Sequence, residues 1–265
     1  MKVYIGQIKP KLGDMDYNLK LMAEVVENAI EGGNDIVVFP ELALTGTVLK
    51  DISYDVATED IPEILIEKSE KIDIIYGAVE LGEDEYCYNV AYYLSEGEIS
   101  GKHKKVYVDN NCFKSGSNFE VLETRFGKMG ILLGDEIYHQ GATFALAQKG
   151  AKYIISLVNE KAILGESRED IGKNTKIIAK ANSLSNSVFT LVVNRAGIED
   201  GVVFAGNSYL VSPMGELVYE GSYLKEEEMT WEVDSDIIRR AKIQHGFSKD
   251  ENIDLIIKEL KNINN

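Results

Sequence analysis

Two apolar segments that each end in a carboxylate constrain the fold of this chain more than any other feature. Residues 130–133 are apolar and are followed by a glycine and two acids at 134–136, and residues 36–39 are apolar and are followed by a proline and Glu41. Continuous apolar runs of this length are typical of strands buried on both faces of a sheet. Polar groups just past the carboxyl ends of such strands lie where α/β proteins keep their sites. The sequence therefore predicts an α/β fold with its chemistry at this edge.

Hydrophobic periodicity predicts alternating strands and helices along the rest of the chain. Apolar residues at every third or fourth position indicate helices, whereas the alternation in residues 86–99 indicates antiparallel or edge strands. The predicted strands cover residues 2–8, 36–39, 73–81, 86–99, 153–158, 188–193, 208–211 and 216–219, and the predicted helices cover 16–30, 62–72, 141–149, 171–184 and 252–263. No repeat or flexible linker divides the chain, so we expect one domain, residues 1–265.

The motifs of this chain resemble those of the nitrilase superfamily of carbon-nitrogen hydrolases. The resemblance rests on segments 39–46 (FPELALTG), 102–105, 130–151, 193–195 (VNR) and 204–208 (FAGNS). In motif the chain is most similar to the glutaminase domain of glutamine-dependent NAD synthetases. The resemblance implies a four-layer α-β-β-α sandwich and a homodimer, and a small amide or amino acid as ligand.

The chain departs from this family at the nucleophile. Family members use a glutamate as general base, a lysine that stabilises the oxyanion and a cysteine nucleophile; Glu41 matches the first and Lys105 the second. Gly134 occupies the cysteine position, and the spacing to residues 150–151 leaves no gap that could restore it. Loss of a nucleophile costs on the order of 10⁶ in kcat in comparable catalytic units. The resemblance therefore leaves open whether the chain is an enzyme.

Three interpretations follow from this departure. The first is a catalytically degenerate protein that binds a small amide or amino acid between Glu41 and Lys105. The second is an active amidase or glutaminase-like hydrolase that uses Cys112 or a water activated by Glu41 and Glu136. The third is a structural oligomerisation partner. The loop at 106–115 is shorter than in the family and lacks its additional glutamate, which favours the first and third; an engineered change at residue 134 would not explain this loop.

The candidate site residues have structural alternatives. Along an extended strand Glu136 would share the face of Gly134, and Asp135 would point away. Glu136 could equally be a structural carboxylate near the start of the next helix. Glu41 could cap a helix or lie in a solvated turn, and Lys105 belongs to a basic cluster that could be a charged turn, with a register uncertain by one residue.

Composition limits the partners. The net charge of −16 and the pI of about 4.7 disfavour nucleic acid and anionic membranes, which carry like charge. No apolar run is long enough to span a bilayer, and we expect a cytoplasmic protein with no membrane partner. The cysteines, Cys87 and Cys112, and the three histidines, His103, His139 and His245, show no metal-ligand spacing. The sequence predicts no metal and no cofactor.

Overall fold

The computed structural model describes residues 1–108, 112–163, 165, 170, 172–247 and 250–263. Two six-stranded mixed sheets form its centre. The first has the order β14-β1-β2-β3-β4-β5, formed by Glu227–Glu232, Lys2–Gln7, Ile36–Val38, Asp73–Leu81, Cys87–Ser95 and Glu98–Lys104. Strands β1, β2 and β3 are parallel, and the other pairings are antiparallel. The carboxyl ends of β2 and β5 therefore reach the same edge.

The second sheet is organised in the same way. Its order is β13-β12-β9-β8-β7-β6, formed by Leu217–Glu220, Tyr209–Val211, Phe189–Asn194, Tyr153–Val158, Gly127–Leu133 and Val121–Thr124. Strands β7, β8 and β9 are parallel. A separate hairpin pairs β10 (Ala196–Glu199) with β11 (Val202–Ala205).

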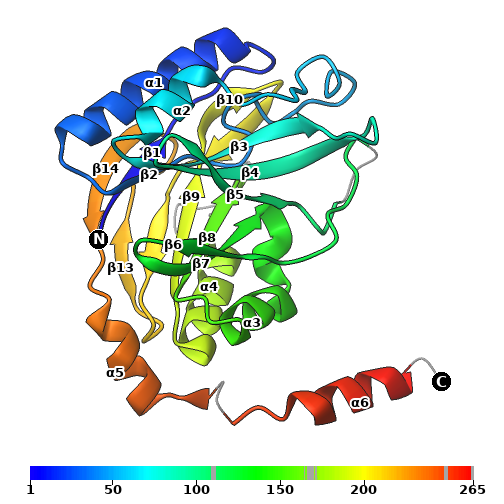
Figure 1. Cartoon of the computed structure of the whole chain (residues 1–265), viewed down its shortest axis with the longest axis vertical. Helices are drawn as coiled ribbons and strands as arrows, with labels where there is room; N and C mark the ends of the chain where they lie inside the picture. The colour runs from blue at the N-terminus through cyan, green and yellow to red at the C-terminus, as the bar shows by residue number, and fades with distance from the viewer. Residues whose placement is uncertain (109–111, 164, 166–169, 171, 248–249, 264–265) are drawn as a thin grey trace.

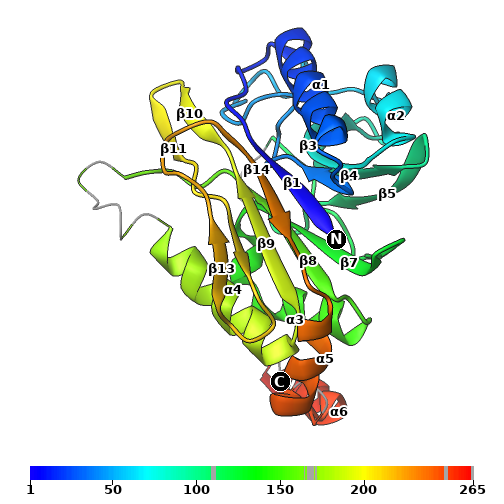
Figure 2. The same cartoon turned by 90° about the vertical axis from the view of Figure 1, so that its left-hand side faces the viewer.

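Helices cover the outer face of each sheet, so that the layers run α-β-β-α (Figure 1). Helices α1 (Met15–Glu31) and α2 (Glu63–Ser69) bury their apolar faces on the first sheet, and α3 (Gln140–Gln148) and α4 (Lys173–Asn186) bury theirs on the second. A third apolar cluster, which includes Ile5, Ile131 and Leu191, fills the space between the sheets. Figure 2 shows the two helical layers on opposite sides of the strands. The predicted four-layer sandwich is confirmed.

Most predicted elements match within a residue or two. The strands at 73–81 and 153–158 have the predicted bounds, and the helix predicted at 171–184 begins at Lys173, with Ile171 outside the described residues. The prediction omitted β6, the β10–β11 hairpin, β14, helix α5 (Asp236–Gln244) and all but the first two residues of β5. Strand β14 lies at a sheet edge with one face in solvent, so exposed residues alternate along it with half-buried or buried ones.

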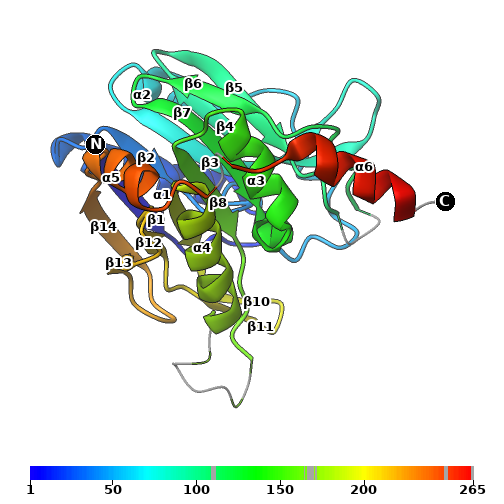
Figure 3. The same cartoon turned by 90° about the horizontal axis from the view of Figure 1, so that it is seen from below.

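The last helix, α6 (Ile253–Ile263), projects away from the sandwich (Figures 1 and 3). None of its residues is buried, although it has a strongly apolar face. Among the described helices, no segment is both long and apolar enough to cross a membrane.

Candidate functional site

Glu41 follows β2 and is a firmly held carboxylate at the sheet edge. Its side chain is buried, and Oε1 accepts a hydrogen bond from Asn89 Nδ2 (2.7 Å) while Oε2 accepts one from Asn159 Nδ2 (2.9 Å). Gly77 on β3 makes this placement possible, because a Cβ there would lie 2.3 Å from Leu42 N. Burial raises the pKa of Glu41, partly offset by Lys105 and Asn89. Glu41 is thus a carboxylate with increased basicity.

Lys105 follows β5 and faces Glu41 from the same sheet. Its Nζ lies 3.3 Å from Glu41 Oε1 and 3.1 Å from Asp135 Oδ1. Burial alone would lower the pKa of this ammonium, but the two carboxylates outweigh burial and raise it above the usual value. Lys105 therefore remains charged at neutral pH. Of the neighbouring lysines, Lys102 and Lys104 form ion pairs with Glu80, and Lys105 is the one that lies beside Glu41.

Gly134 lies where Glu41 and Lys105 converge. Its backbone is left-handed, with φ +56°, and a Cβ at this position would lie 2.6 Å from Lys105 Nζ and 3.0 Å from each carboxylate oxygen of Glu41. The ammonium of Lys105 thus lies close to the space that a side chain at residue 134 would fill. Beside these groups is a cavity of about 300 Å³. Its lining residues are Glu41, Lys105, Gly134, Asp135, Tyr138, Val158, Asn159, Glu160, Lys161 and Thr175.

The expectation that Glu136 joins Glu41 in the cavity was wrong. Residues Gly134–Tyr138 form a 3-10 helix that begins at the left-handed glycine, so the two-residue alternation of a strand ends there. Glu136 is fully buried on the other side, where it accepts hydrogen bonds from Leu133 N (2.8 Å) and Val106 N (2.6 Å) and contacts His103 Nε2 (2.7 Å). Asp135, expected to point away, lines the cavity instead.

The far wall of the cavity follows β8 and was missed by the sequence analysis. Asn159, Glu160 and Lys161 come directly after this strand, as Glu41 comes after β2. Thr175 Oγ1 on α4 donates to the Glu160 carboxylate, and Asn194 Oδ1 accepts from Glu160 N (3.0 Å). The strand-end rule applied to residues 36–41 would have found this wall.

The other candidates lie outside the cavity. Cys112 Sγ donates to Lys50 O (2.8 Å), and Cys112 does not line the cavity. His139 is exposed and stacks on Tyr107 at a centroid distance of 3.5 Å. The segment 204–208 supports the far wall from behind, where Ala205 N donates to Glu160 O (2.8 Å). The centre of the loop at 106–115, residues 109–111, lies outside the described residues.

Within the described ranges, no group of three or more His, Cys, Asp or Glu side chains could hold a metal ion. The cavity instead offers the Glu41 carboxylate, which can accept a proton. It also offers the Lys105 ammonium and the Asn159 amide, which can donate hydrogen bonds to a ligand oxygen.

Comparison with known proteins agrees with this architecture. The family model for carbon-nitrogen hydrolases matches residues 2–243. The chain belongs to the carbon-nitrogen hydrolase family. A probable nitrilase of Schizosaccharomyces pombe is 26% identical to this chain, and the match covers 87% of each protein. An (R)-stereoselective amidase of Pseudomonas sp is 25% identical over 96% of this chain and 92% of its own length.

Two further comparisons concern the NAD synthetases and the fold. The chain spans 46% of the glutamine-dependent NAD(+) synthetase of Acinetobacter baylyi, with 24% identity. A nitrilase-superfamily protein of Saccharomyces cerevisiae superposes with a TM-score of 0.82 at 22% identity, covering 92% of this chain and 93% of that one. An amidase mutant of Nesterenkonia sp. AN1, with the acetamide moiety of fluoroacetamide added at its active site cysteine, superposes with a TM-score of 0.84 at 19% identity, covering 97% and 96%. At these identities the two structures inform the fold alone.

Proposed function

We propose that this carbon-nitrogen hydrolase family member is catalytically degenerate and binds a small amide or amino-acid-like ligand beside Glu41 and Lys105. The observation that carries the proposal is Gly134, a residue without a side chain at the point where a base and an ammonium meet. Glycine cannot attack a carbonyl, and the thiol of Cys112 does not line the cavity. A base and an oxyanion donor without a nucleophile still form a polar cradle for an amide.

The two walls of the cavity suit an α-amino acid with a side-chain amide. At the inner end, Glu41 can accept from an amide N–H and Lys105 can donate to the amide carbonyl. At the outer end, Glu160 offers a carboxylate for an ammonium and Lys161 an ammonium for a carboxylate. A volume of about 300 Å³ is at the small end of the range for ligand pockets. Glutamine is therefore the first ligand to test.

A hydrolase that activates water is the second candidate, and the basicity of Glu41 favours it. A water in the space beside Gly134 would lie within reach of a carboxylate whose pKa burial has raised. Glu136 takes no part in this version, because its oxygens accept from Leu133 N and Val106 N. The two candidates differ in whether ammonia is released.

The experiment measures glutamine and propionamide binding by calorimetry and ammonia release by a coupled assay. The proteins are the natural chain, Glu41→Gln and the control Glu98→Gln, which changes an exposed carboxylate on β5. The proposal expects binding without ammonia release, lost in Glu41→Gln and retained in the control. Ammonia release that disappears in Glu41→Gln supports the water mechanism. Absence of any binding, with normal assembly in all three proteins, supports a structural partner instead.

The proposal extends to self-association. The exposed apolar face of α6 consists of Ile253, Leu255, Ile256, Ile257, Leu260 and Ile263. A helix this short is marginal in water without a surface on which to bury such a face. A second copy provides one, because a two-fold axis places the same stripe on both partners. We assign the chain to the cytoplasm, in line with Cys87 and Cys112, which form no disulfide bond among the described residues.

A further inference from the structure

Asn194 and Arg195, at the end of β9, link the far wall of the cavity (residues 159–161) to the loop that carries Glu41. Asn194 Oδ1 accepts hydrogen bonds from Glu160 N (3.0 Å) and from Arg195 N (2.9 Å). Its Nδ2 donates to Gly206 O (2.7 Å). Asn194 therefore fixes the backbone of the far wall at the residue that carries one of its carboxylates.

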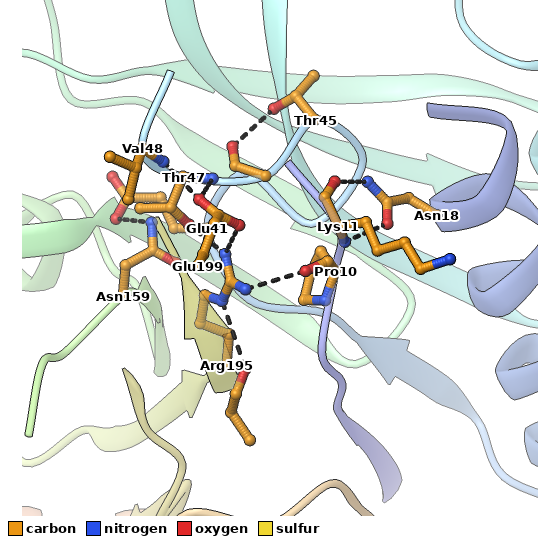
Figure 4. A network of polar contacts seen from close by, with 12 residues as sticks. Pro10, Lys11, Asn18, Glu41, Thr45, Thr47, Val48, Asn159, Arg195 and Glu199 are labelled. Carbon is orange, nitrogen blue, oxygen red and sulfur yellow. Dashed lines mark hydrogen bonds and ion pairs between the residues drawn. The ribbon is translucent and has the colours of Figure 1, made fainter. Parts of the chain in front are cut away.

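Arg195, the next residue, reaches toward the other wall (Figure 4). Its side chain is completely buried and forms an ion pair with Glu199 at the end of β10. The guanidinium also donates to Thr47 Oγ1 (2.9 Å) and to Pro10 O (3.0 Å). Thr47 and Pro10 belong to the loops that follow β2 and β1, so the contacts run from the second sheet to the first.

Glu199 completes this connection from its other carboxylate oxygen. Oε1 accepts from Thr47 N (2.7 Å) and Val48 N (2.6 Å), in the segment that continues from Glu41. Gly46 in this segment has φ +81°, and a Cβ there would lie 2.7 Å from Leu12 Cα. The loop is therefore closely packed against the ion pair and has no room to shift freely.

We propose that the Arg195–Glu199 ion pair is a positioning element that sets the place of Glu41 relative to Gly134 and the far wall. Neither residue lines the cavity, so both act through the loop that carries Glu41. A buried pair is weak evidence for stability, because desolvation offsets much of the attraction between the charges. Its contacts here are instead concentrated on the segments that form the two walls.

This inference rests on the proposed function only for its use in ligand binding, and its geometry can be tested without ligand. The reporter is the thiol introduced by Gly134→Cys, in a Cys112→Ser background, alkylated by iodoacetamide over a range of pH and followed by peptide mass spectrometry. Cys87, the other natural thiol, is buried. The nearby Glu41 carboxylate disfavours a thiolate, whereas Lys105 favours it. The pH midpoint of alkylation therefore reports how closely Glu41 is held.

Two conservative substitutions test the contacts of this ion pair. Glu199→Gln keeps a carbonyl for Thr47 N and Val48 N but removes the charge, and Thr47→Val removes only the hydroxyl that Arg195 contacts. Asp200→Asn is the matched control, because the exposed Lys50–Asp200 ion pair joins the same two segments at the surface. Such exposed pairs contribute little.

A positioning role predicts that Glu199→Gln lowers the midpoint by about half a pH unit or more, because Glu41 moves away while Lys105 stays. Thr47→Val should give a smaller change in the same direction, and Asp200→Asn none. Glu41→Gln in the reporter protein removes the carboxylate charge and therefore gives the largest expected shift of the alkylation midpoint. An unchanged midpoint in folded Glu199→Gln would overturn the proposal and leave the pair a purely structural role.

Ligand titration separates this proposal from the proposed function. Absence of glutamine and propionamide binding in the natural chain counts against the proposed function alone, since the thiol midpoint still reports the position of Glu41. If the natural chain binds glutamine, Glu199→Gln should lower its affinity for glutamine roughly tenfold, which corresponds to about 1.4 kcal/mol. Asp200→Asn should bind normally.

Discussion

Gly134→Cys tests the proposal that the cavity lacks only a nucleophile, and the cost of this substitution follows from the local geometry. The new Cβ would lie 2.6 Å from Lys105 Nζ and 3.0 Å from both Glu41 oxygens. These are the ends of flexible side chains, so rotation of Lys105 can relieve the contact. The remaining cost is the left-handed backbone, φ +56°, which is about 1–2 kcal/mol for a residue with a Cβ.

This cost converts into a modest change of Tm. With an unfolding entropy of about 2.1 cal/mol/K per residue, the entropy of a chain of 265 residues rises by about 0.56 kcal/mol/K on unfolding. A loss of about 1–2 kcal/mol therefore lowers Tm by about 2–4 °C. Gly134→Ala carries the same backbone cost without a thiol and should lose a similar amount, which differential scanning calorimetry can measure.

The activity assay is ammonia release from glutamine and a panel of small amides. Gly134→Cys should hydrolyse at least one of them and accumulate an acyl adduct at the introduced thiol, detected by intact-mass measurement. Adding Glu41→Gln should lower the rate by about 10²–10⁴, the usual contribution of a general base. Equal activity in Gly134→Ala, or a Tm loss far above 4 °C in both variants, would refute the reasoning about this position.

The remaining predictions concern packing, pH and assembly. Gly77→Ala should cost about 1–3 kcal/mol, because its Cβ would lie 2.3 Å from Leu42 N; an unchanged Tm would contradict this close approach. Glu136→Ala should cost about 3–5 kcal/mol by leaving buried donors without an acceptor, whereas the exposed Glu98→Ala should cost little in the same denaturant titration. Amide affinity should fall as pH decreases through the raised pKa of Glu41, where the carboxylate is protonated and stops accepting N–H donors; a calorimetric pH series that stays flat would refute this role. By linkage, a raised carboxyl pKa makes the contribution of Glu41 to stability largest at acid pH and smaller as pH rises through the folded pKa. If the proposed dimer forms through α6, deletion of residues 253–265 should leave only monomer in light scattering, and a dimer that persists would place the interface elsewhere.

The residue pattern predicted the strand ends, and the family resemblance implied the four layers. The apolar runs before Glu41 and Gly134 correspond to strands whose ends meet at one edge, because parallel strands in both sheets deliver their carboxyl ends there. The pairing of Lys105 with Glu41 came from the family resemblance, since no periodicity brings the ends of β2 and β5 together.

The errors have physical causes. Glu136 was assigned to the cavity because an extended strand was assumed beyond residue 133, but the left-handed Gly134 starts a 3-10 helix and rotates Asp135 inward instead. The contacts of Arg195 with Thr47 and Pro10 could not be predicted, because these partners are about 150 and 185 positions away in the sequence. Such contacts depend on how the two sheets stack.

The exposed stripe of α6 belongs to a chain with a net charge of −16. Copies of the chain repel one another over a range set by the ionic strength, whereas the stripe attracts only at contact. Added salt shortens the repulsion and leaves the apolar attraction in place. The balance between single and paired chains should therefore shift with salt concentration, so that dilute buffer favours separate molecules and physiological salt favours pairs. The acidic surface therefore opposes self-association to an extent that depends on ionic strength.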